Sequence, residues 1–91
     1  MMSPSYCRCA TVDTSAVSDR VVLLERQSRR TLVLNPTGSA LWNLLATPRT
    51  PEELVRHIRT QFPTLSAPQA QQDVEAYLRE LLEQHLIEPA S

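Results

Sequence analysis

The apolar residues in the first third of the chain lie in short runs with polar neighbours, a pattern typical of β-strands. The clearest run is Arg20–Arg26, which is apolar in the middle and charged at both ends. Tyr6–Val12 and Thr31–Leu34 are two further strand candidates. The polar segment Asp13–Asp19 is predicted to be a loop, and residues 27–30 are predicted to form a hairpin turn. Because these links are short, we expect the three strands to pair as an antiparallel meander.

The rest of the chain carries apolar residues at helical spacing and predicts three helices. They cover about residues 36–46, 51–62 and 67–85, and proline-containing breaks separate them. Thr50 and Ser66 are expected to start the second and third helices. Each is followed three residues later by Glu or Gln, which is the pattern of a capping box.

Strands that precede helices, instead of alternating with them, predict an α+β fold. We expect an N-terminal three-stranded antiparallel sheet followed by three helices of winged helix-turn-helix type. The length predicts one domain over residues 1–91. Residues 1–5 are expected to be disordered, Leu86 and Ile87 to close the core, and Pro89 to end the ordered chain.

The composition is that of an ordinary globular protein, with 42% hydrophobic residues, 21% charged residues and a formal net charge of −1. This balance gives no bulk attraction to nucleic acid or to an anionic membrane, and neither is expected as a partner. The charge is nevertheless uneven: residues 1–49 carry six Arg and three acidic residues, whereas residues 50–91 carry three Arg and seven acidic residues. The sequence has no apolar run long enough to span a bilayer and no signal-peptide pattern, so a cytoplasmic location is expected.

The residues that could support catalysis or bind a metal do not form a recognisable motif. Cys7 and Cys9 fall on one side of a predicted strand, but a metal site needs about four ligands. His57 and His85 lie on separate predicted helices without the spacing of ligands, so buried or half-buried thiols are the favoured interpretation. Ser39 follows the only glycine, yet the G-x-S-x-G elbow of a serine nucleophile is absent. We therefore predict no catalytic residue, metal or cofactor.

An arginine cluster marks the predicted hairpin, where Arg26, Arg29 and Arg30 lie close together. A solvated turn is the favoured interpretation, and a wing tip that contacts an anionic partner is the alternative. The third helix argues against DNA, because it carries four acidic residues and one Arg where a recognition helix would meet phosphates. A small winged-helix DNA-binding protein and a structural subunit of an enzyme complex both stay open as alternatives.

The third predicted strand, Thr31–Leu34, comes last in the meander and is expected at a sheet edge. Proteins usually blunt such an edge with Lys, Pro or an inward charge, and the sequence TLVL contains none of these. The edge is therefore either covered by the protein's own helix or open to a partner strand, which would add through backbone hydrogen bonds. The third helix can pack beside it as the far wall of a groove. Tyr77 suits this wall, although plain core packing of Tyr77 and Val74 is equally compatible with the sequence.

The junction between the third strand and the first helix reads LNPTGSALWNLL, and the segments TPEELVRHI and DVEAYLRELLEQHLIE follow it. An asparagine N-cap followed by proline at the first helical position makes a sharp strand-to-helix corner. This ordered set, over about residues 21–88, resembles the PqqD-like family, the RiPP recognition elements. Five residues match the signature of that family and are interpreted as structural: Asn35, Pro36, Gly38, Leu41 and Trp42.

The resemblance implies a peptide-binding function. Members of that family bind the leader segment of a ribosomally made precursor peptide as an additional antiparallel strand on the third strand. The side chains of the leader then enter a cleft against the third helix. By position, the resemblance implies these peptide-binding residues: Arg30, Thr31, Leu32, Val33, Leu34, Ala70, Asp73, Val74, Tyr77 and Leu81.

The resemblance also implies the partners. The chain would be a non-catalytic, stand-alone element that delivers the precursor peptide to a leader protease or another modifying enzyme. An element of this size resembles those of lasso-peptide pathways, in which a separate leader protease and a cyclase act on the delivered precursor. It also resembles those of quinone-cofactor pathways, in which the partner is a radical enzyme.

Overall fold

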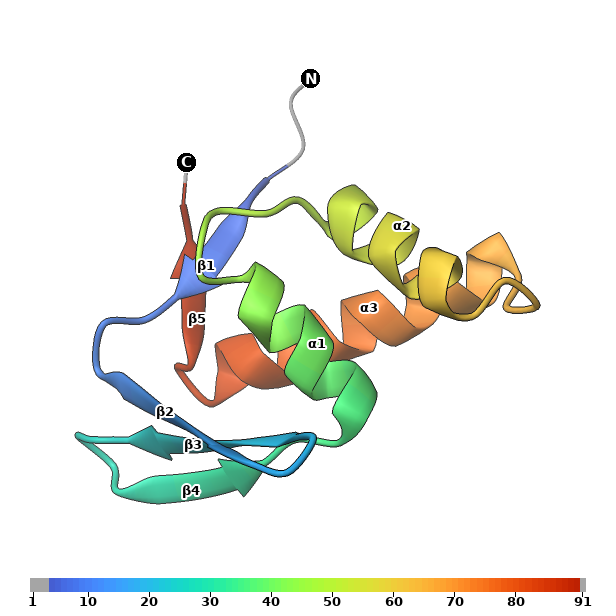
Figure 1. Cartoon of the computed structure of the whole chain (residues 1–91). Coiled ribbons are helices and arrows are strands. Elements are labelled where there is room, and N and C mark those ends of the chain that lie inside the picture. The colour runs from blue at the N-terminus through green and yellow to red at the C-terminus, as the bar shows by residue number, and fades with distance from the viewer. Residues whose placement is uncertain (1–3, 91) are drawn as a thin grey trace.

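The computed structural model describes residues 4–90 and has an α+β fold with two antiparallel sheets and three helices. Figure 1 shows the helices on one side of the three-stranded sheet, with a separate two-stranded pair standing beside them. The elements in chain order are β1 (Tyr6–Arg8), β2 (Val12–Val17), β3 (Arg20–Glu25), β4 (Arg30–Val33), α1 (Pro36–Leu44), α2 (Pro51–Gln61), α3 (Ala67–Glu83) and β5 (Ile87–Pro89).

The predicted three-stranded meander exists, but its first strand was assigned wrongly. The sheet has the order β2-β3-β4, and β2 lies almost entirely within the segment predicted to be a loop. This strand was missed because five of its six residues are exposed, so its sequence lacks the apolar alternation of a half-buried strand. A tight turn with Ser18 in the left-handed region (φ 60°) joins it to β3.

The segment predicted as the first strand divides at a turn around Ala10 and Thr11, and only its beginning forms β1. β1 pairs with β5 instead of the meander, with Arg8 opposite Ile87. Its backbone also bonds the loop between α1 and α2, because Tyr6 and Arg49 exchange two hydrogen bonds of 2.8 and 2.9 Å. These are long-range partners, which the local pattern of the sequence does not reveal.

The C-terminal end of the chain differs from the prediction in two places. α3 ends at Glu83, and His85 adopts the left-handed conformation (φ 60°) while the N–H of Leu86 donates to Leu81 O over 2.9 Å. This is a Schellman-type ending, which turns the chain from the helix into β5. Pro89 was expected to end the order, but it lies inside β5.

The two ends of the described chain are bonded to each other. The N–H of Ala90 donates to Ser5 O and the hydroxyl of Ser5 donates to Ala90 O, both over 2.9 Å. Of residues 1–5, which were expected to be disordered, residues 1–3 lie outside the described residues.

The core lies between the inner face of the three-stranded sheet and the three helices. Trp42 is its largest fully buried side chain, and its indole N–H donates to the hydroxyl oxygen of Thr14 on β2 over 3.0 Å. Arg8 of β1 lies over the Trp42 ring, 4.9 Å from its centroid, and ties β1 to α1. The prediction that Leu86 and Ile87 close the core is confirmed. The buried hydrophobic residues are Val21, Leu23, Leu34, Leu41, Trp42, Leu45, Leu54, Ile58, Ala70, Val74, Leu78, Leu81, Leu86 and Ile87.

The predicted helix starts are confirmed, with one difference. The side chain of Thr50 accepts from the N–H of Glu53, and the Glu53 carboxylate accepts from the N–H of Thr50, which closes a capping box. The side chain of Ser66 likewise accepts from the N–H of Gln69. The amide of Gln69 does not complete the box but donates to Asp73, four residues further along the helix.

Ser39 of α1 joins the first helix to the sheet. Its hydroxyl accepts a hydrogen bond from the N–H of Val21 over 2.8 Å and lies 3.4 Å from the carbonyl oxygen of Leu34, to which it donates. The N–H of Leu34 in turn donates to the carbonyl of Val21 over 2.9 Å. This buried serine therefore satisfies the backbone groups at the point where the ladder between β3 and β4 ends.

We predict that Ser39→Ala lowers the free energy of unfolding by about 1–3 kcal/mol, because the buried N–H of Val21 loses its acceptor. Chemical denaturation followed by circular dichroism measures this change. Ser15→Ala is the control, because Ser15 is exposed on β2 and its loss is expected to cost less than about 0.5 kcal/mol. Equal stability of the two variants would contradict this role of Ser39.

Candidate functional site

Strand β4 is an open edge of the three-stranded sheet. Within the described residues it pairs only with β3, and Val33 lies opposite Val22. The N–H of Leu34 donates to β3, and backbone groups in an antiparallel pair alternate between facing the partner strand and facing away. The N–H and C=O groups of Thr31 and Val33 therefore point away from β3, toward the open side. Val33 is 55% exposed.

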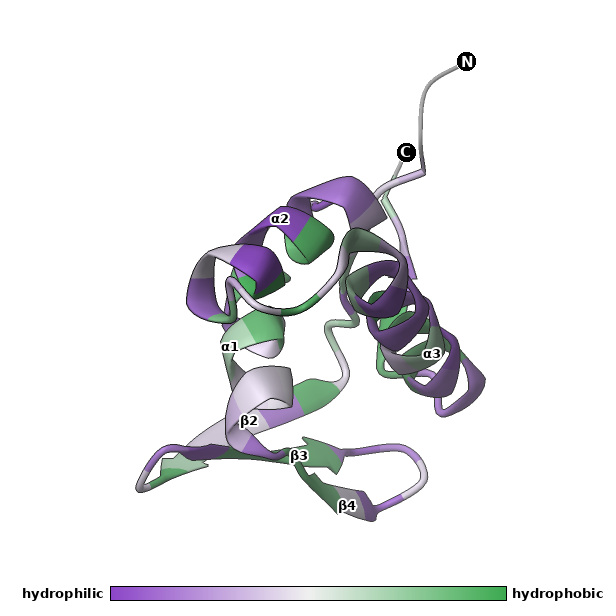
Figure 2. Cartoon of the chain, turned by 90° about the vertical axis from the view of Figure 1, so that its right-hand side faces the viewer, coloured by the Kyte–Doolittle hydropathy of each residue, from purple (hydrophilic) through white to green (hydrophobic). Residues whose placement is uncertain are grey.

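A cavity of about 340 Å³ lies beside this edge, between β4, the start of α1 and one flank of α3. Figure 2 shows apolar residues along β3 and β4 and mainly polar residues along the outer side of α3. We call this cavity the groove, and it is lined by Leu32, Val33, Leu34, Asn35, Thr37, Gly38, Leu41, Ile58, Asp73, Ala76, Tyr77, Glu80 and Leu81.

The structure brings six of the ten sequence-predicted site residues together in the groove. They are Leu32, Val33 and Leu34 on β4 and Asp73, Tyr77 and Leu81 on α3. Arg30 and Thr31 are exposed at the hairpin end of β4 and do not line the groove. Ala70 and Val74 do not line it either, because both are fully buried in the core.

Several lining residues were not predicted as part of the site. Ala76 and Glu80 lie on the same flank of α3 as Asp73 and Tyr77, three residues further along the helix in each case, so helical spacing could have identified them. Ile58 comes from α2, and its position depends on how the helices pack. Asn35, Thr37, Gly38 and Leu41 come from the strand-to-helix corner, which the sequence had marked as structural.

Tyr77 connects the wall of the groove to its floor. Its hydroxyl donates to the carbonyl oxygen of Gly38 over 2.8 Å, and its ring is half-buried against the core. The two interpretations of Tyr77 left open by the sequence, core packing and groove wall, therefore both apply. Burial raises the pKa of the hydroxyl well above its usual range, while the positive charge of Arg8 opposes this shift and the negative charge of Glu80 adds to it.

Gly38 allows the close approach of Tyr77. A side-chain carbon at this position would lie 3.2 Å from Oδ1 of Asn35 and 3.3 Å from Cε1 of Tyr77, which is tighter than ordinary contact. Oδ1 of Asn35 is itself held at 2.7 Å by the N–H of Gly38, as expected for an N-cap. The lack of a side chain thus sets the separation between the corner and α3.

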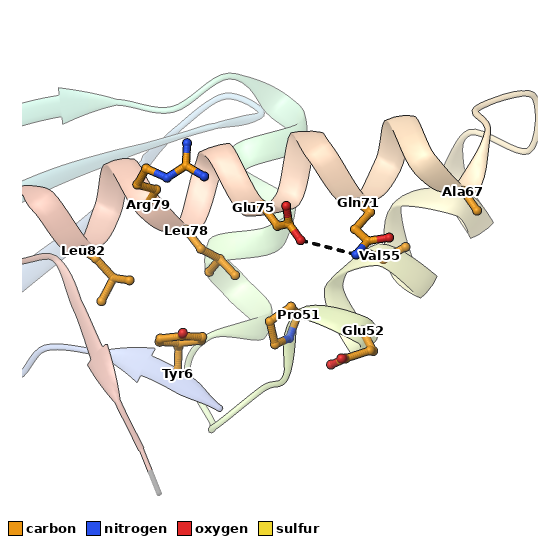
Figure 3. Close-up of a pocket in the computed structure, with 10 residues that line it drawn as sticks. All are labelled: Tyr6, Pro51, Glu52, Val55, Ala67, Gln71, Glu75, Leu78, Arg79 and Leu82. Carbon is orange, nitrogen blue, oxygen red and sulfur yellow. Dashed lines mark hydrogen bonds between the residues drawn. The ribbon is translucent and has the colours of Figure 1, made fainter. Parts of the chain in front are cut away.

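A second and larger cavity, of about 580 Å³, lies on the opposite flank of α3, between that helix, the start of α2 and Tyr6 of β1. Figure 3 shows the Tyr6 ring below Leu78 and beside Pro51, and the amide of Gln71 donating to Glu75. That hydrogen bond is 3.3 Å long. None of the sequence-predicted site residues lines this cavity.

The residues considered for metal binding or catalysis lie apart from the groove. Cys7 and Cys9 are half-buried free thiols, and burial raises the pKa of Cys9, with the nearby negative charge of Glu88 adding to the shift. His57 is half-buried on α2, and His85 is exposed at the end of α3. Among residues 4–90, no group of three or more His, Cys, Asp or Glu side chains is placed to hold a metal ion.

No helix within residues 4–90 is long and apolar enough to cross a membrane.

Comparisons with known proteins identify the family. The model of the family described as coenzyme PQQ synthesis protein D (PqqD) matches residues 20–87, so the chain belongs to the PqqD family. No curated protein sequence matches the chain.

Two solved structures are similar to the chain. One is TbiB1 in complex with the TbiA(beta) leader peptide, with 29% identity and a TM-score of 0.85, covering 93% of this chain and 98% of that one. The other is a lasso peptide synthetase B1 complexed with the leader peptide, with 19% identity and a TM-score of 0.79, covering 92% of this chain and 98% of that one. At 19% identity, the second structure supports the fold alone.

We predict that Tyr77→Phe lowers the free energy of unfolding by about 0.5–1.5 kcal/mol, because the carbonyl of Gly38 loses its donor while the ring packing is kept. Denaturation near neutral pH measures this loss. Tyr6→Phe is the matched control, with an expected change below about 0.5 kcal/mol. Within residues 4–90, the Tyr6 hydroxyl forms no hydrogen bond that the substitution would remove.

The same variant tests the raised pKa of Tyr77. Above pH ~10 an unfolded tyrosine loses its proton, whereas the folded chain still holds the proton of Tyr77. Raising the pH beyond that value therefore favours unfolding of the wild-type chain. Tyr77→Phe lacks this contribution, so its stability should fall less steeply with alkaline pH. Parallel pH profiles for the two proteins would contradict the assigned burial of the hydroxyl.

Proposed function

We propose that this chain binds the leader segment of a ribosomally made precursor peptide by strand addition to β4. The observation that carries the proposal is the open edge itself, whose outward backbone groups at Thr31 and Val33 lie beside an apolar groove. A peptide strand added there would gain backbone hydrogen bonds from β4. Its alternate side chains would face the groove, which supplies selectivity.

The likeness to TbiB1 supports this proposal, because that protein was solved in complex with a leader peptide. The similarity extends over 93% of this chain and 98% of that one, and the TM-score of 0.85 indicates the same fold. We infer that all ten residues implied by the sequence resemblance take part, in three ways. Those that line the groove contact leader side chains. Arg30 and Thr31 contact the leader backbone or its exposed side, and Ala70 and Val74 support the wall from the core.

We infer that the pathway is one of lasso-peptide biosynthesis and that the chain acts without catalysing a reaction itself. Its role would be to hold the leader while a leader protease, a cyclase or another modifying enzyme acts on the precursor. An antiparallel leader would run opposite to β4, so its C-terminal end would leave the groove near Arg30 and the hairpin between β3 and β4. The region to be modified would therefore emerge at that end.

A winged helix-turn-helix protein that binds DNA is the alternative function. The exposed side of α3 disfavours it, because the carboxylates of Asp73, Glu75, Glu80 and Glu83 would face the phosphates of a duplex. A purely structural subunit is the other alternative, and it would bind an enzyme but no peptide. The groove beside an open strand favours the peptide-binding function over both.

We predict that Val33→Pro lowers the affinity for the leader about tenfold or more, because it removes an outward N–H and places a ring on the open edge. The fold should survive, since proline is tolerated at edge positions whose N–H faces solvent. Fluorescence anisotropy measures the affinity, with the labelled leader of a precursor peptide encoded next to the gene for this protein. Thr31→Pro tests the second outward N–H in the same way.

Ala16→Pro is the matched control on the opposite edge. The N–H of Arg26 donates to Thr11 O, so backbone alternation along β2 directs the N–H of Ala16 away from β3. This variant carries the same ring on the same kind of edge but away from the groove, and we expect wild-type affinity. If the variants at Thr31 and Val33 keep their circular dichroism spectra and still bind like the wild type, strand addition to β4 is wrong.

A further inference from the structure

We propose that the peptide segment bound in the groove carries Lys or Arg beside an apolar anchor, and that Asp73 and Glu80 select for these cationic side chains. The inference rests on the proposed function, and it specifies the chemistry of the leader that this chain accepts. It is carried by the composition of the groove, where an apolar floor lies beneath two carboxylates.

The charges that line the groove all have one sign. Asp73 and Glu80 are its two ionisable acidic residues, and the lining includes no Lys, Arg or His. The arginines nearest in sequence lie elsewhere: Arg79 lines the cavity on the opposite flank of α3, and Arg30 lines a separate cavity at the hairpin end of β4. The positive charge of Arg8 also acts on Tyr77, but its guanidinium is hydrogen-bonded to the carbonyl oxygen of Trp42 and does not line the groove. The two carboxylates would therefore attract a basic peptide segment and repel an acidic one.

Both carboxylates are held by neutral partners. The amide of Gln69 donates to Asp73 over 2.8 Å, and the amide of Gln84 donates to Glu80 over 3.3 Å. An amide fixes the position of a carboxylate without neutralising its charge, so each group stays available to a cation from a ligand. Both residues are exposed, which keeps their carboxylates accessible from solvent.

The spacing of the two carboxylates fits an extended peptide. They are seven residues apart on α3, which corresponds to about 10.5 Å along the helix axis. In an extended peptide, the residues two positions before and two positions after a central residue face the same side as that residue and lie ~13 Å apart. Long side chains of Lys or Arg at these two positions can reach both carboxylates. The residue between them would face Tyr77 and the apolar floor at Leu32 and Leu81.

The test uses Asp73→Asn and Glu80→Gln, singly and together, and the labelled leader of the precursor encoded beside this chain. Because each exposed charge pair is worth a factor of about two to five in affinity at low salt, each single variant should bind the leader that much more weakly. The loss of affinity in the double variant should be about the product of the two single losses. Raising the salt from about 0.01 M to about 1 M should largely remove the difference from the wild type, because it screens exposed charges.

Glu75→Gln is the matched control. Glu75 is also an exposed carboxylate of α3 held by a glutamine four residues away, but it lines the cavity on the opposite flank. Its neutralisation changes the net charge by the same amount and should leave leader binding unchanged. If Glu75→Gln weakens binding as much as the two groove variants do, the effect is one of net charge and the inference is wrong.

A charge exchange completes the test. Leader peptides with the Lys or Arg residues of the bound segment changed to Glu should bind the wild-type chain more weakly. They should regain affinity for the variant carrying both Asp73→Lys and Glu80→Lys. If the wild-type chain binds no leader at all, the proposed function fails and the inference fails with it. If it binds the leader but neither neutralisation nor charge exchange changes the affinity, only the selection for cationic side chains is wrong.

Discussion

The corner between β4 and α1 fixes how the sheet, the first helix and α3 lie relative to one another. There, the serine hydroxyl of Ser39 takes over the backbone pairing that the ladder loses as β4 ends. The Asn35 side chain caps the helix within the same few residues. The hydrogen bond from Tyr77 to the carbonyl of Gly38 then fixes α3 against this corner. The distance between the open strand and the opposite wall of the groove is thus set by a few buried and partly buried polar contacts.

Helix α3 presents different stripes of side chains to the core, to the groove and to the second cavity. One stripe, formed by Ala70, Val74, Leu78 and Leu81, is buried and holds the helix on the core. Asp73, Ala76, Tyr77 and Glu80 on the adjacent flank border the groove, while the other flank borders the larger cavity with Tyr6. Because the two flanks do not share lining residues, the groove can be altered without changing the second cavity. The charge of the groove is therefore a property of one helix flank.

The sequence was informative where a local pattern determines the structure. The caps at Asn35, Thr50 and Ser66 follow from short-range hydrogen bonding, and the helices begin where these caps predict. The edge position of β4 also followed from its place in the meander. The partner of β1 and the existence of β5 could not be predicted, because they depend on contacts between the two ends of the chain. β2 was missed because an exposed edge strand needs no apolar side chains.

The same reasoning explains why the site was only partly predictable. Strand alternation and helix periodicity identify which residues share a face, but not how deeply the face is buried. Val74 and Tyr77 are three residues apart on α3, and one is a core residue while the other borders the groove. The sheet has two edges with similar backbones, β2 and β4, and what distinguishes them is the groove beside β4. Backbone hydrogen bonds alone would not favour one edge, so under the proposed function the choice of β4 rests on side-chain contacts in the groove, including its two carboxylates.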